Sequence, residues 1–318
     1  MDNYYISFPQ ATSVYEDSWS LIKQMGGQNF QIGKSYKGTS IKSKILRLTS
    51  LLLGMAKFAI KTFKNDDAVF LLIPYNLPLK WLFYNIVLHK KINLYLIMID
   101  LSKARDERIN DEQEKKVCNK AKAIMAQTEL MKNEMISRGY SFKIDKNKIF
   151  ISHFWPIFTK LQPIGKSSFG DSIAFSGALY KAPFASMLPE LDKRLQFVVN
   201  PQFRMITEDW GLVWDGKSVD TCSGEYGDYM KIVYPYKASL YLASNRPLIV
   251  WKESGIADFV IENHLGIAIG SLYEIHDAIH SLTDYDKKLI LQSVATFCNI
   301  IRTGSDRIKL LNQMITLK

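Results

Sequence analysis

Hydrophobic and polar positions along the chain form short apolar runs separated by amphipathic stretches. The apolar runs predict buried strands at 4–8, 68–73, 94–99, 121–126, 148–152, 173–175, 212–214 and 248–251. Helical spacing between these runs predicts helices at 14–26, 77–88, 128–138, 287–301 and 306–318. Strands that alternate with helices are typical of parallel sheets, so the fold class is predicted to be α/β.

The stretch 210–255 gives the clearest strand–helix–strand unit. The strand at 212–214 ends in Asp215-Gly216, and the strand at 248–251 ends in Glu253-Ser254-Gly255. Because ligands of parallel sheets bind at the carboxyl ends of the strands, we expect Trp214, Asp215, Glu253 and Ser254 to lie at a binding edge.

A helix lies between these two strands. Pro235 fits its first position, and Tyr236 begins its apolar face. The first turns also contain Lys237 and Ser239, and the free N–H groups of a helix start favour an anion such as a diphosphate. A lysine there costs the helix itself ~0.3–1 kcal/mol, which favours an anionic ligand. The alternative is that Lys237 is a solvated surface lysine.

The longest amphipathic pattern covers 41–64. One face holds Ile41, Ile45, Leu48, Leu52, Met55, Ala59 and Phe63. The basic residues Lys44, Arg47, Lys57 and Lys61 lie away from it. Further apolar positions around the helix are Leu46, Leu51, Leu53, Phe58 and Ile60. Three interpretations remain: a helix packed on the sheet with a basic outer face, an anionic membrane surface, or an interface between subunits.

The chain has a Rossmann-like beginning. A first strand is followed by the small-residue loop 9–13 and then by a helix. Thr12 and Ser13 could cap that helix. Further along, the Gly-, Ser- and Pro-rich segment 161–171 is predicted to be a linker. After it, Gly177 allows a tight turn and Lys181 stands near the next helix start.

Composition is consistent with two globular domains. The chain has 318 residues, of which 47% are hydrophobic. The net charge is +10, but residues 1–165 carry 25 basic and 14 acidic residues (+11), whereas residues 166–318 carry 16 and 17 (−1). Aromatic residues do not interleave with this charge as in a stacking platform, so no nucleic-acid partner is expected.

Several chemistries lack their sequence signatures. Neither GxxxxGK[ST] nor GxGxxG occurs, and no DxD pair follows a strand. His153, His264 and His280 are far apart in sequence, so no metal and no cofactor is expected. The scattered Cys118, Cys222 and Cys298 form no disulfide framework, and neither a signal peptide nor a membrane span is predicted. A cytoplasmic location, with or without peripheral membrane contact, is therefore expected.

The runs GLVWDG and YPYKASLYLASNRPLIVWKESGIADFVIENHLGI resemble the C-terminal domain of GT-B glycosyltransferases. They are most similar to the glucosyltransferases that extend O-linked GlcNAc on serine-rich-repeat adhesins of streptococci and lactobacilli. The resemblance is strongest over 170–270 and weaker over the first 160 residues. It implies two Rossmann-like domains facing across a cleft, at 1–160 and 172–300, a linker at 161–171, and a terminal helix at 301–318 that packs back towards the first domain.

The resemblance also implies roles for individual residues. Lys181 and Lys237 would stabilise the diphosphate of a departing UDP without a metal, and the loop with Thr12 and Ser13 would touch the nucleotide sugar. The remaining donor-binding candidates are Trp214 and Asp215 beside the base, Glu253 and Ser254 on ribose or sugar hydroxyls, and Tyr236 and Ser239 at the helix start. Ala178 replaces the asparagine that the family commonly has after the glycine. No general base can be named, so the catalytic residues are unknown.

The predicted function is transfer of a hexose, with glucose or GlcNAc favoured, from a UDP-sugar to a glycan acceptor. The expected acceptor is O-GlcNAc on a serine-rich adhesin, presented as a glycopeptide or glycan, and a homo-oligomer (dimer or tetramer) is expected. Two alternatives remain. One is a non-catalytic GT-B subunit that binds a partner transferase or a membrane, and the other is a hexosyl- or galactofuranosyltransferase of capsule or exopolysaccharide synthesis.

Overall fold

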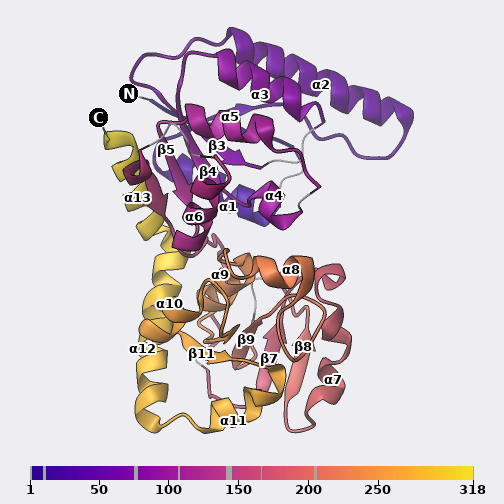
Figure 1. Cartoon of the computed structure of the whole chain (residues 1–318), viewed down its shortest axis with the longest axis vertical. Helices are drawn as coiled ribbons and strands as arrows, with labels where there is room; N and C mark the ends of the chain where they lie inside the picture. Colours follow the sequence, from indigo (N-terminus) through magenta and orange to yellow (C-terminus); the bar gives the residue numbers. More distant parts are fainter. Residues whose placement is uncertain are drawn as a thin grey trace. The chain divides into compact units, whose positions relative to one another are not determined.

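The computed structural model describes residues 2–9, 12–74, 78–106, 108–140, 145–165, 167–203 and 206–317. They form two compact units, one of Met1–Ser152 with Arg307–Lys318 and the other of His153–Asp306. Below, these are called the first and the second unit, and each has its own sheet (Figure 1). Five residues of predicted segments lie outside the described residues: Gln10, Ala11, Leu77, Lys166 and Lys318.

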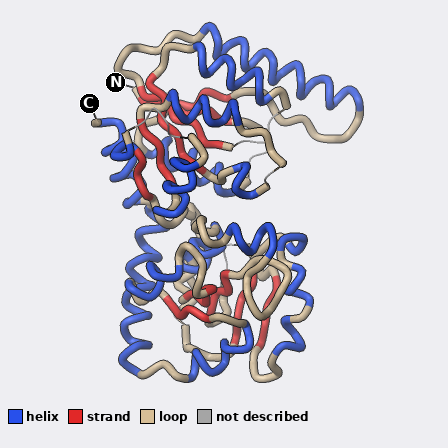
Figure 2. Tube along the Cα trace, viewed as in Figure 1, coloured by secondary structure: helices blue, strands red, loops and turns tan. Residues whose placement is uncertain are grey.

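The first unit is built on a six-stranded parallel sheet with strand order β2-β1-β3-β4-β5-β6. The strands are β1 (Asn3–Ser7), β2 (Gln28–Gln31), β3 (Ala68–Ile73), β4 (Asn93–Met98), β5 (Ala123–Ala126) and β6 (Ile149–Ile151). The helices are α1 (Ser13–Gln24), α2 (Ile41–Ile60), α3 (Lys80–His89), α4 (Ser102–Arg105), α5 (Glu112–Lys120), α6 (Glu129–Ser137) and α13 (Ser305–Thr316), with the 3-10 turn η1 at Lys146–Lys148. Figure 2 shows the strands running between helices.

The second unit is built on a five-stranded sheet with strand order β11-β10-β9-β7-β8, in which every pair is parallel. Its strands are β7 (Ser172–Phe175), β8 (Gln196–Val199), β9 (Trp210–Val213), β10 (Leu248–Trp251) and β11 (Gly266–Ile269). Its helices are α7 (Leu188–Leu191), α8 (Gly224–Tyr229), α9 (Tyr236–Ala243), α10 (Ala257–Glu262), α11 (Ile275–His280) and α12 (Asp284–Thr303). Short 3-10 turns are η2 (Leu179–Lys181), η3 (Pro183–Ser186) and η4 (Leu272–Glu274).

The strands predicted from apolar runs are confirmed, and β3 and β10 match the predicted ranges residue for residue. Strands β2, β8 and β11 were not predicted from the sequence. All three lie at sheet edges, and none of the residues of Gln28–Gln31 or Gln196–Val199 is fully buried. In β2 Phe30 is the one large apolar residue, so this strand lacks the continuous apolar run by which a central parallel strand is recognised.

Helix α2 packs on the first unit through a different face from the predicted one. Its buried residues are Leu51, Gly54, Met55 and Phe58, whereas Ile41, Ile45, Leu48 and Leu52 of the predicted face are exposed. A Cβ on Gly54 would lie 2.7 Å from the backbone nitrogen of Gly33, so the glycine permits a close crossing. The predicted outer lysines Lys44, Lys57 and Lys61 are exposed, but large apolar side chains are exposed on α2 as well.

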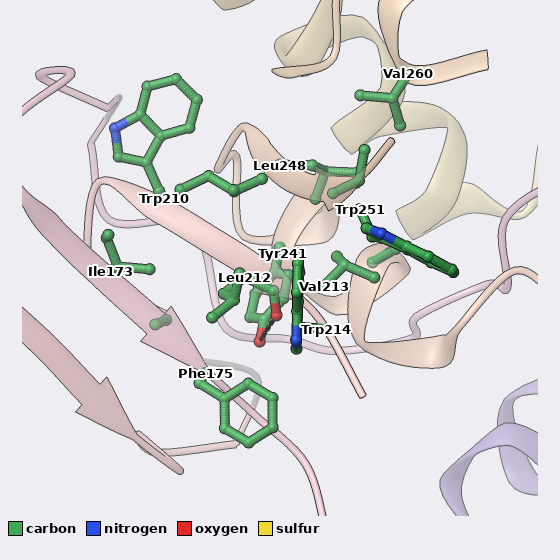
Figure 3. Packing of buried hydrophobic residues seen from close by; sticks show 14 of the residues in the cluster. Ile173, Phe175, Trp210, Leu212, Val213, Trp214, Tyr241, Leu248, Trp251 and Val260 are labelled. Carbon is green, nitrogen blue, oxygen red and sulfur yellow. Dashed lines mark hydrogen bonds between the residues drawn. The ribbon is translucent and has the colours of Figure 1, made fainter. Parts of the chain in front are cut away.

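The core of the second unit is dense around the contact between α9 and β9. Trp210, Trp214, Trp251 and Tyr241 are all buried in this core, and Figure 3 shows their positions. A Cβ on Gly211 would lie 2.1 Å from Cγ of Tyr241, so only a glycine in β9 leaves space for this ring. The Tyr241 hydroxyl donates to the carbonyl of Leu212 (3.2 Å) and accepts from the Ser176 N–H (2.6 Å). Tyr241 thus fixes the end of β7 relative to β9.

The segment predicted as a linker packs on the second unit. The Arg246 guanidinium is 2% exposed and donates to the carbonyl oxygens of Ile164 (2.5 Å) and Gly165 (3.2 Å). Asp209 accepts from the Ser168 N–H and from the Ser172 hydroxyl, both at 2.7 Å. The domain boundaries expected from the sequence stay predictions.

Both sheets reverse their strand order at one place. In the first unit the chain moves outward in opposite directions from β1 and β3, and in the second unit from β7 and β9. In open α/β sheets such a reversal leaves a crevice at the carboxyl ends of the two strands, and ligands bind there. The topology therefore directs attention to the segments that follow β7 and β9.

None of the helices that the structure describes combines the length and the apolar character needed to cross a bilayer.

Candidate functional site

The segments after β7 and β9 are joined by a backbone hydrogen bond. The Gly216 N–H donates to the carbonyl oxygen of Lys181 at 3.1 Å. Gly216 has φ +108°, and a Cβ there would lie 2.6 Å from the Ser223 carbonyl oxygen, so the turn needs glycine. Lys181 and Asp215 are thereby brought to the same end of the sheet, as the βαβ pattern in the sequence predicts.

Lys237, in the first turn of α9, places its ammonium at this end of the sheet. Its Nζ donates to Asp215 Oδ1 and to the carbonyl oxygen of Trp214, both at 2.9 Å. It also lies 4.6 Å from the centre of the Phe175 ring. The Lys237 side chain is 10% exposed and that of Asp215 16%. The interpretation of Lys237 as a solvated surface lysine is therefore wrong.

This geometry has a consequence for any anion that binds here. The Asp215 carboxylate already compensates the charge of Lys237. Both charged groups are largely buried, and the attraction between two charges is stronger in the protein interior than at the surface. An anion at the end of α9 must share the ammonium with Asp215 or displace that carboxylate. The pair keeps the ammonium fixed and compensated.

The turn after β7 is shaped to leave space beside this ammonium. A Cβ on Gly177 would lie 3.3 Å from Lys237 Nζ and 3.1 Å from the Phe175 ring, so a larger residue would crowd both. The Gly177 N–H donates to Asn200 Oδ1 at 2.9 Å. Asn200, after β8, was not predicted as a site residue. It supplies an amide at the turn where Ala178 replaces the expected asparagine.

Lys181 ends the short turn η2 and lies between two aromatic rings. Its Nζ is 5.3 Å from the Tyr226 ring centre and 5.8 Å from the Tyr180 ring centre. The two rings meet edge to face at 6.1 Å. Cation–π contacts of this kind help to hold an ammonium in place. Lys181 is thus a positioned cation at the same sheet end as Lys237.

Three polar side-chain atoms at the carboxyl ends of β7 and β10 are buried and make no hydrogen bond within the described part of the chain. They are Ser176 Oγ, Trp251 Nε1 and Ser254 Oγ. A buried polar atom normally has a partner, so these atoms could bond a ligand or a water molecule. Glu253, the neighbour of Ser254, is exposed and forms a surface ion pair with Lys231 at 3.5 Å.

Two predicted donor-binding side chains have structural roles instead. The Trp214 ring is fully buried and its Nε1 donates to the Ser218 carbonyl oxygen (2.9 Å), so it offers no face to a base. Ser239 is also fully buried, and its hydroxyl accepts from the Trp155 N–H at 2.8 Å. Tyr236 opens α9 and is half-buried. The predicted roles of the Trp214 and Ser239 side chains are therefore corrected.

Thr12 and Ser13 lie in the first unit, at the carboxyl end of β1. Thr12 is the N-cap residue of α1, but its side chain makes no capping hydrogen bond. Nearby, the Tyr15 hydroxyl donates to the carbonyl oxygen of Pro74, which follows β3. This contact joins the two segments at the strand-order reversal of the first sheet.

A further group of side chains could hold a metal ion. Asp171, His276 and His280 have ligand atoms within 4.8 Å of one another, and His280 Nε2 lies 2.9 Å from Asp171 Oδ1. His276 and His280 stand one turn apart on α11, a relation that the predicted scatter of histidines did not include. Asp171 precedes β7, so this group lies at the amino ends of the strands, whereas Lys237 lies at their carboxyl ends.

The cysteines do not form a reactive group. Cys118, Cys222 and Cys298 are all buried and unbridged. Burial raises the pKa of the Cys222 thiol to about 12, so this thiol, close to the turn after β9, stays protonated at neutral pH.

Comparisons with known proteins find relatives among glycosyltransferases. Residues 196–314 match the family model described as "Glucosyltransferase 3-like, C-terminal domain". Over 96 residues, 30% of the chain, the sequence is 43% identical to the beta-1,6-galactofuranosyltransferase WbbI of Escherichia coli, covering 29% of that protein. Over 205 residues it is 23% identical to Glucosyltransferase 3 of Streptococcus gordonii, covering 58% of this chain and 59% of that one. The chain therefore spans less than two thirds of the curated relatives it matches.

Solved structures show the fold. The sucrose-phosphate synthase of Thermosynechococcus elongatus superposes with a TM-score of 0.61 at 10% identity, covering 99% of this chain and 98% of that one. The pneumococcal O-GlcNAc transferase GtfA, solved with UDP and GlcNAc, superposes with a TM-score of 0.52 at 11% identity, covering 84% and 59%. The predicted GT-B fold class and the resemblance to Glucosyltransferase 3-type glycosyltransferases are confirmed.

Proposed function

We propose that the protein is a glycosyltransferase that takes a hexose from a UDP-sugar without a metal ion and transfers it to a glycan acceptor. The observation that carries the proposal is the Lys237 ammonium at the strand-order reversal of the second sheet, held 2.9 Å from Asp215 and beside Gly177. The named relatives are a galactofuranosyltransferase and a glucosyltransferase, and the GtfA structure contains UDP.

The chemistry required of such a site is charge stabilisation. As the bond between sugar and diphosphate breaks, negative charge develops on the departing UDP. Fixed positive groups that are already oriented stabilise that charge without reorganisation. Lys237 and Lys181 supply two such groups, and the start of α9 adds its dipole. The Ser176 and Ser254 hydroxyls, both buried, would bond donor oxygens.

Asp215 has a part in this proposal that differs from base recognition. In this structure it compensates Lys237. When a diphosphate binds, it either displaces the Asp215 carboxylate from the Lys237 ammonium or shares the ammonium with it. Removal of the Asp215 charge should therefore strengthen diphosphate binding, whereas removal of the Lys237 charge should weaken it.

Two donor sugars are favoured by different observations. The match of residues 196–314 to the Glucosyltransferase 3-like model supports glucose. The 43% identity to WbbI supports galactofuranose. GlcNAc as a further donor, and O-GlcNAc on an adhesin or a polysaccharide as acceptor, are expectations that rest on the sequence resemblance. A cytoplasmic homo-oligomer remains our expectation. The non-catalytic alternative is tested by turnover with UDP-glucose, UDP-GlcNAc and UDP-galactofuranose.

The decisive measurement is UDP binding by calorimetry in the presence of EDTA. A charge-assisted hydrogen bond is worth ~1.5–3 kcal/mol, so Lys237→Ala and Lys181→Ala should each weaken UDP by roughly 10- to 150-fold. Lys288→Ala is the matched control, because this exposed lysine on α12 removes the same charge from the same unit. Wild-type affinity in both site variants, or UDP binding only with added divalent metal, would refute the proposed site.

A further inference from the structure

Helix α2 projects from the first unit along half of its length. A helix of 20 residues is about 30 Å long, but all four of its buried residues, Leu51, Gly54, Met55 and Phe58, lie in its second half. None of the residues 41–50 is buried. Figure 1 shows α2 beside α3 and continuing well past it. The crossing at Gly54 thus holds the helix while its first turns extend beyond the sheet.

The outward side of α2 is apolar in two adjacent rows. Ile41, Ile45, Leu48 and Leu52 follow one another at spacings of four, three and four residues, and Leu46, Leu53 and Ile60 at seven. Their exposed fractions run from 39% at Leu52 to 81% at Ile60. Seven large apolar side chains on one face exceed the scattered exposure that is normal on a protein surface. Such a face indicates a partner that accepts apolar groups.

The apolar face is accompanied by positive charge only. From Ser18 to Asn65 the sequence has nine basic residues and no acidic one. Lys42, Lys44, Lys57 and Lys61 are exposed on or next to α2. An amphipathic helix with this composition lies flat in the headgroup region of a bilayer, with apolar side chains among the acyl chains and lysines on anionic headgroups.

We propose that α2 docks the first unit on an anionic lipid surface. The alternative occupant, a second copy of this chain, would bring the α2 helices of both copies, which carry basic and no acidic residues, into one contact. No acidic residue within Ser18–Asn65 could relieve the repulsion between these basic residues. A bilayer with anionic lipids satisfies the apolar rows and the lysines together.

The test is flotation of the whole protein with vesicles. Vesicles of phosphatidylcholine alone are compared with vesicles in which phosphatidylglycerol replaces roughly a third of it. We expect flotation with the anionic vesicles only. Lys42→Glu with Lys57→Glu should lower binding by roughly 30-fold or more, because each lost contact between a lysine and the surface weakens it about fivefold. Ile45→Ser with Leu53→Ser should also lower it.

Matched control variants distinguish an effect of the exposed apolar face of α2 from a general effect of changed charge or lost apolar surface. Lys288→Glu with Lys309→Glu changes charge equally on α12 and α13, and Leu130→Ser with Ile261→Ser removes two similarly exposed apolar residues elsewhere. Both controls should float like the wild type, and all variants should keep the wild-type melting temperature. The proposal is overturned if the wild type does not float, or if neither α2 variant loses binding. A dimer in light scattering that Ile45→Ser with Leu53→Ser converts to monomer, without flotation, would assign the face to self-association instead.

Discussion

The ion pair between Lys237 and Asp215 should be essential to the stability of the second unit, whatever ligand it meets. We consider Lys237→Met, which keeps the length of the side chain and removes its charge. Asp215 would then be left 16% exposed without the ammonium at 2.9 Å. The carbonyl oxygen of Trp214 would lose its donor at 2.9 Å, and the Phe175 ring its cation at 4.6 Å.

The expected cost follows from these losses. Removing one partner of a buried pair costs ~3–5 kcal/mol, and a hydrogen bond to a charged group contributes ~1.5–3 kcal/mol. Because Asp215 keeps some contact with solvent, we expect ~2–4 kcal/mol for Lys237→Met. Adding Asp215→Asn should recover at least half of it, since no uncompensated charge then remains. The double-mutant cycle yields the coupling free energy between Lys237 and Asp215.

Urea unfolding followed by tryptophan fluorescence measures the double-mutant cycle of Lys237→Met and Asp215→Asn in the second unit. Trp155, Trp210, Trp214 and Trp251 are all buried in the second unit, so they report its unfolding. Repeating the cycle in about 1 M salt distinguishes this pair from a surface pair, whose contribution would be screened. A cost below ~0.5 kcal/mol for Lys237→Met, or a double variant no more stable than the single one, would refute the electrostatic argument.

Two further predictions concern the packing and the pH dependence of the fold. Gly211→Ala should destabilise the second unit by ~1–3 kcal/mol or more, because its Cβ would lie 2.1 Å from Tyr241 Cγ, and Tyr241→Leu should partly rescue it in urea unfolding. Burial raises the pKa of Glu114, so the folded state binds its proton more tightly than the unfolded state, and stability falls as pH rises above the ordinary carboxyl pKa of about 4.3. Glu114→Gln should therefore raise the melting temperature at about pH 7 and leave it unchanged near pH 4, and an equal effect at both pH values would contradict this assignment.

The sequence predicted central strands well because burial on both sides leaves a continuous apolar run. The same burial explains the error at Trp214. A residue at the end of a central parallel strand is covered by helices on either face, so the indole of Trp214 packs inward although its backbone borders the site. Position at the binding edge could be read from the pattern, whereas the direction of the side chain could not.

The face on which α2 packs could not be predicted for a related reason. The sequence is apolar around much of the helix, so periodicity alone selects no side. The structure selects the side with Gly54, because the missing side chain permits contact with Ile32 and Gly33. A close backbone crossing decided the orientation, and several large apolar side chains were left outside.

Charge is organised differently at the two places proposed to bind anions. The positive charge of α2 extends over many exposed lysines, so it acts at a distance and weakens with salt, with a Debye length of about 10 Å at 0.1 M. At the proposed donor site the charge of Lys237 is compensated by Asp215 within 2.9 Å, so the field of this ammonium falls off over a short distance. A diphosphate is then recognised only when it reaches the ammonium itself. The long-range attraction of the first unit to an anionic surface and the short-range selection of a nucleotide by the second unit can therefore operate in one chain without interfering.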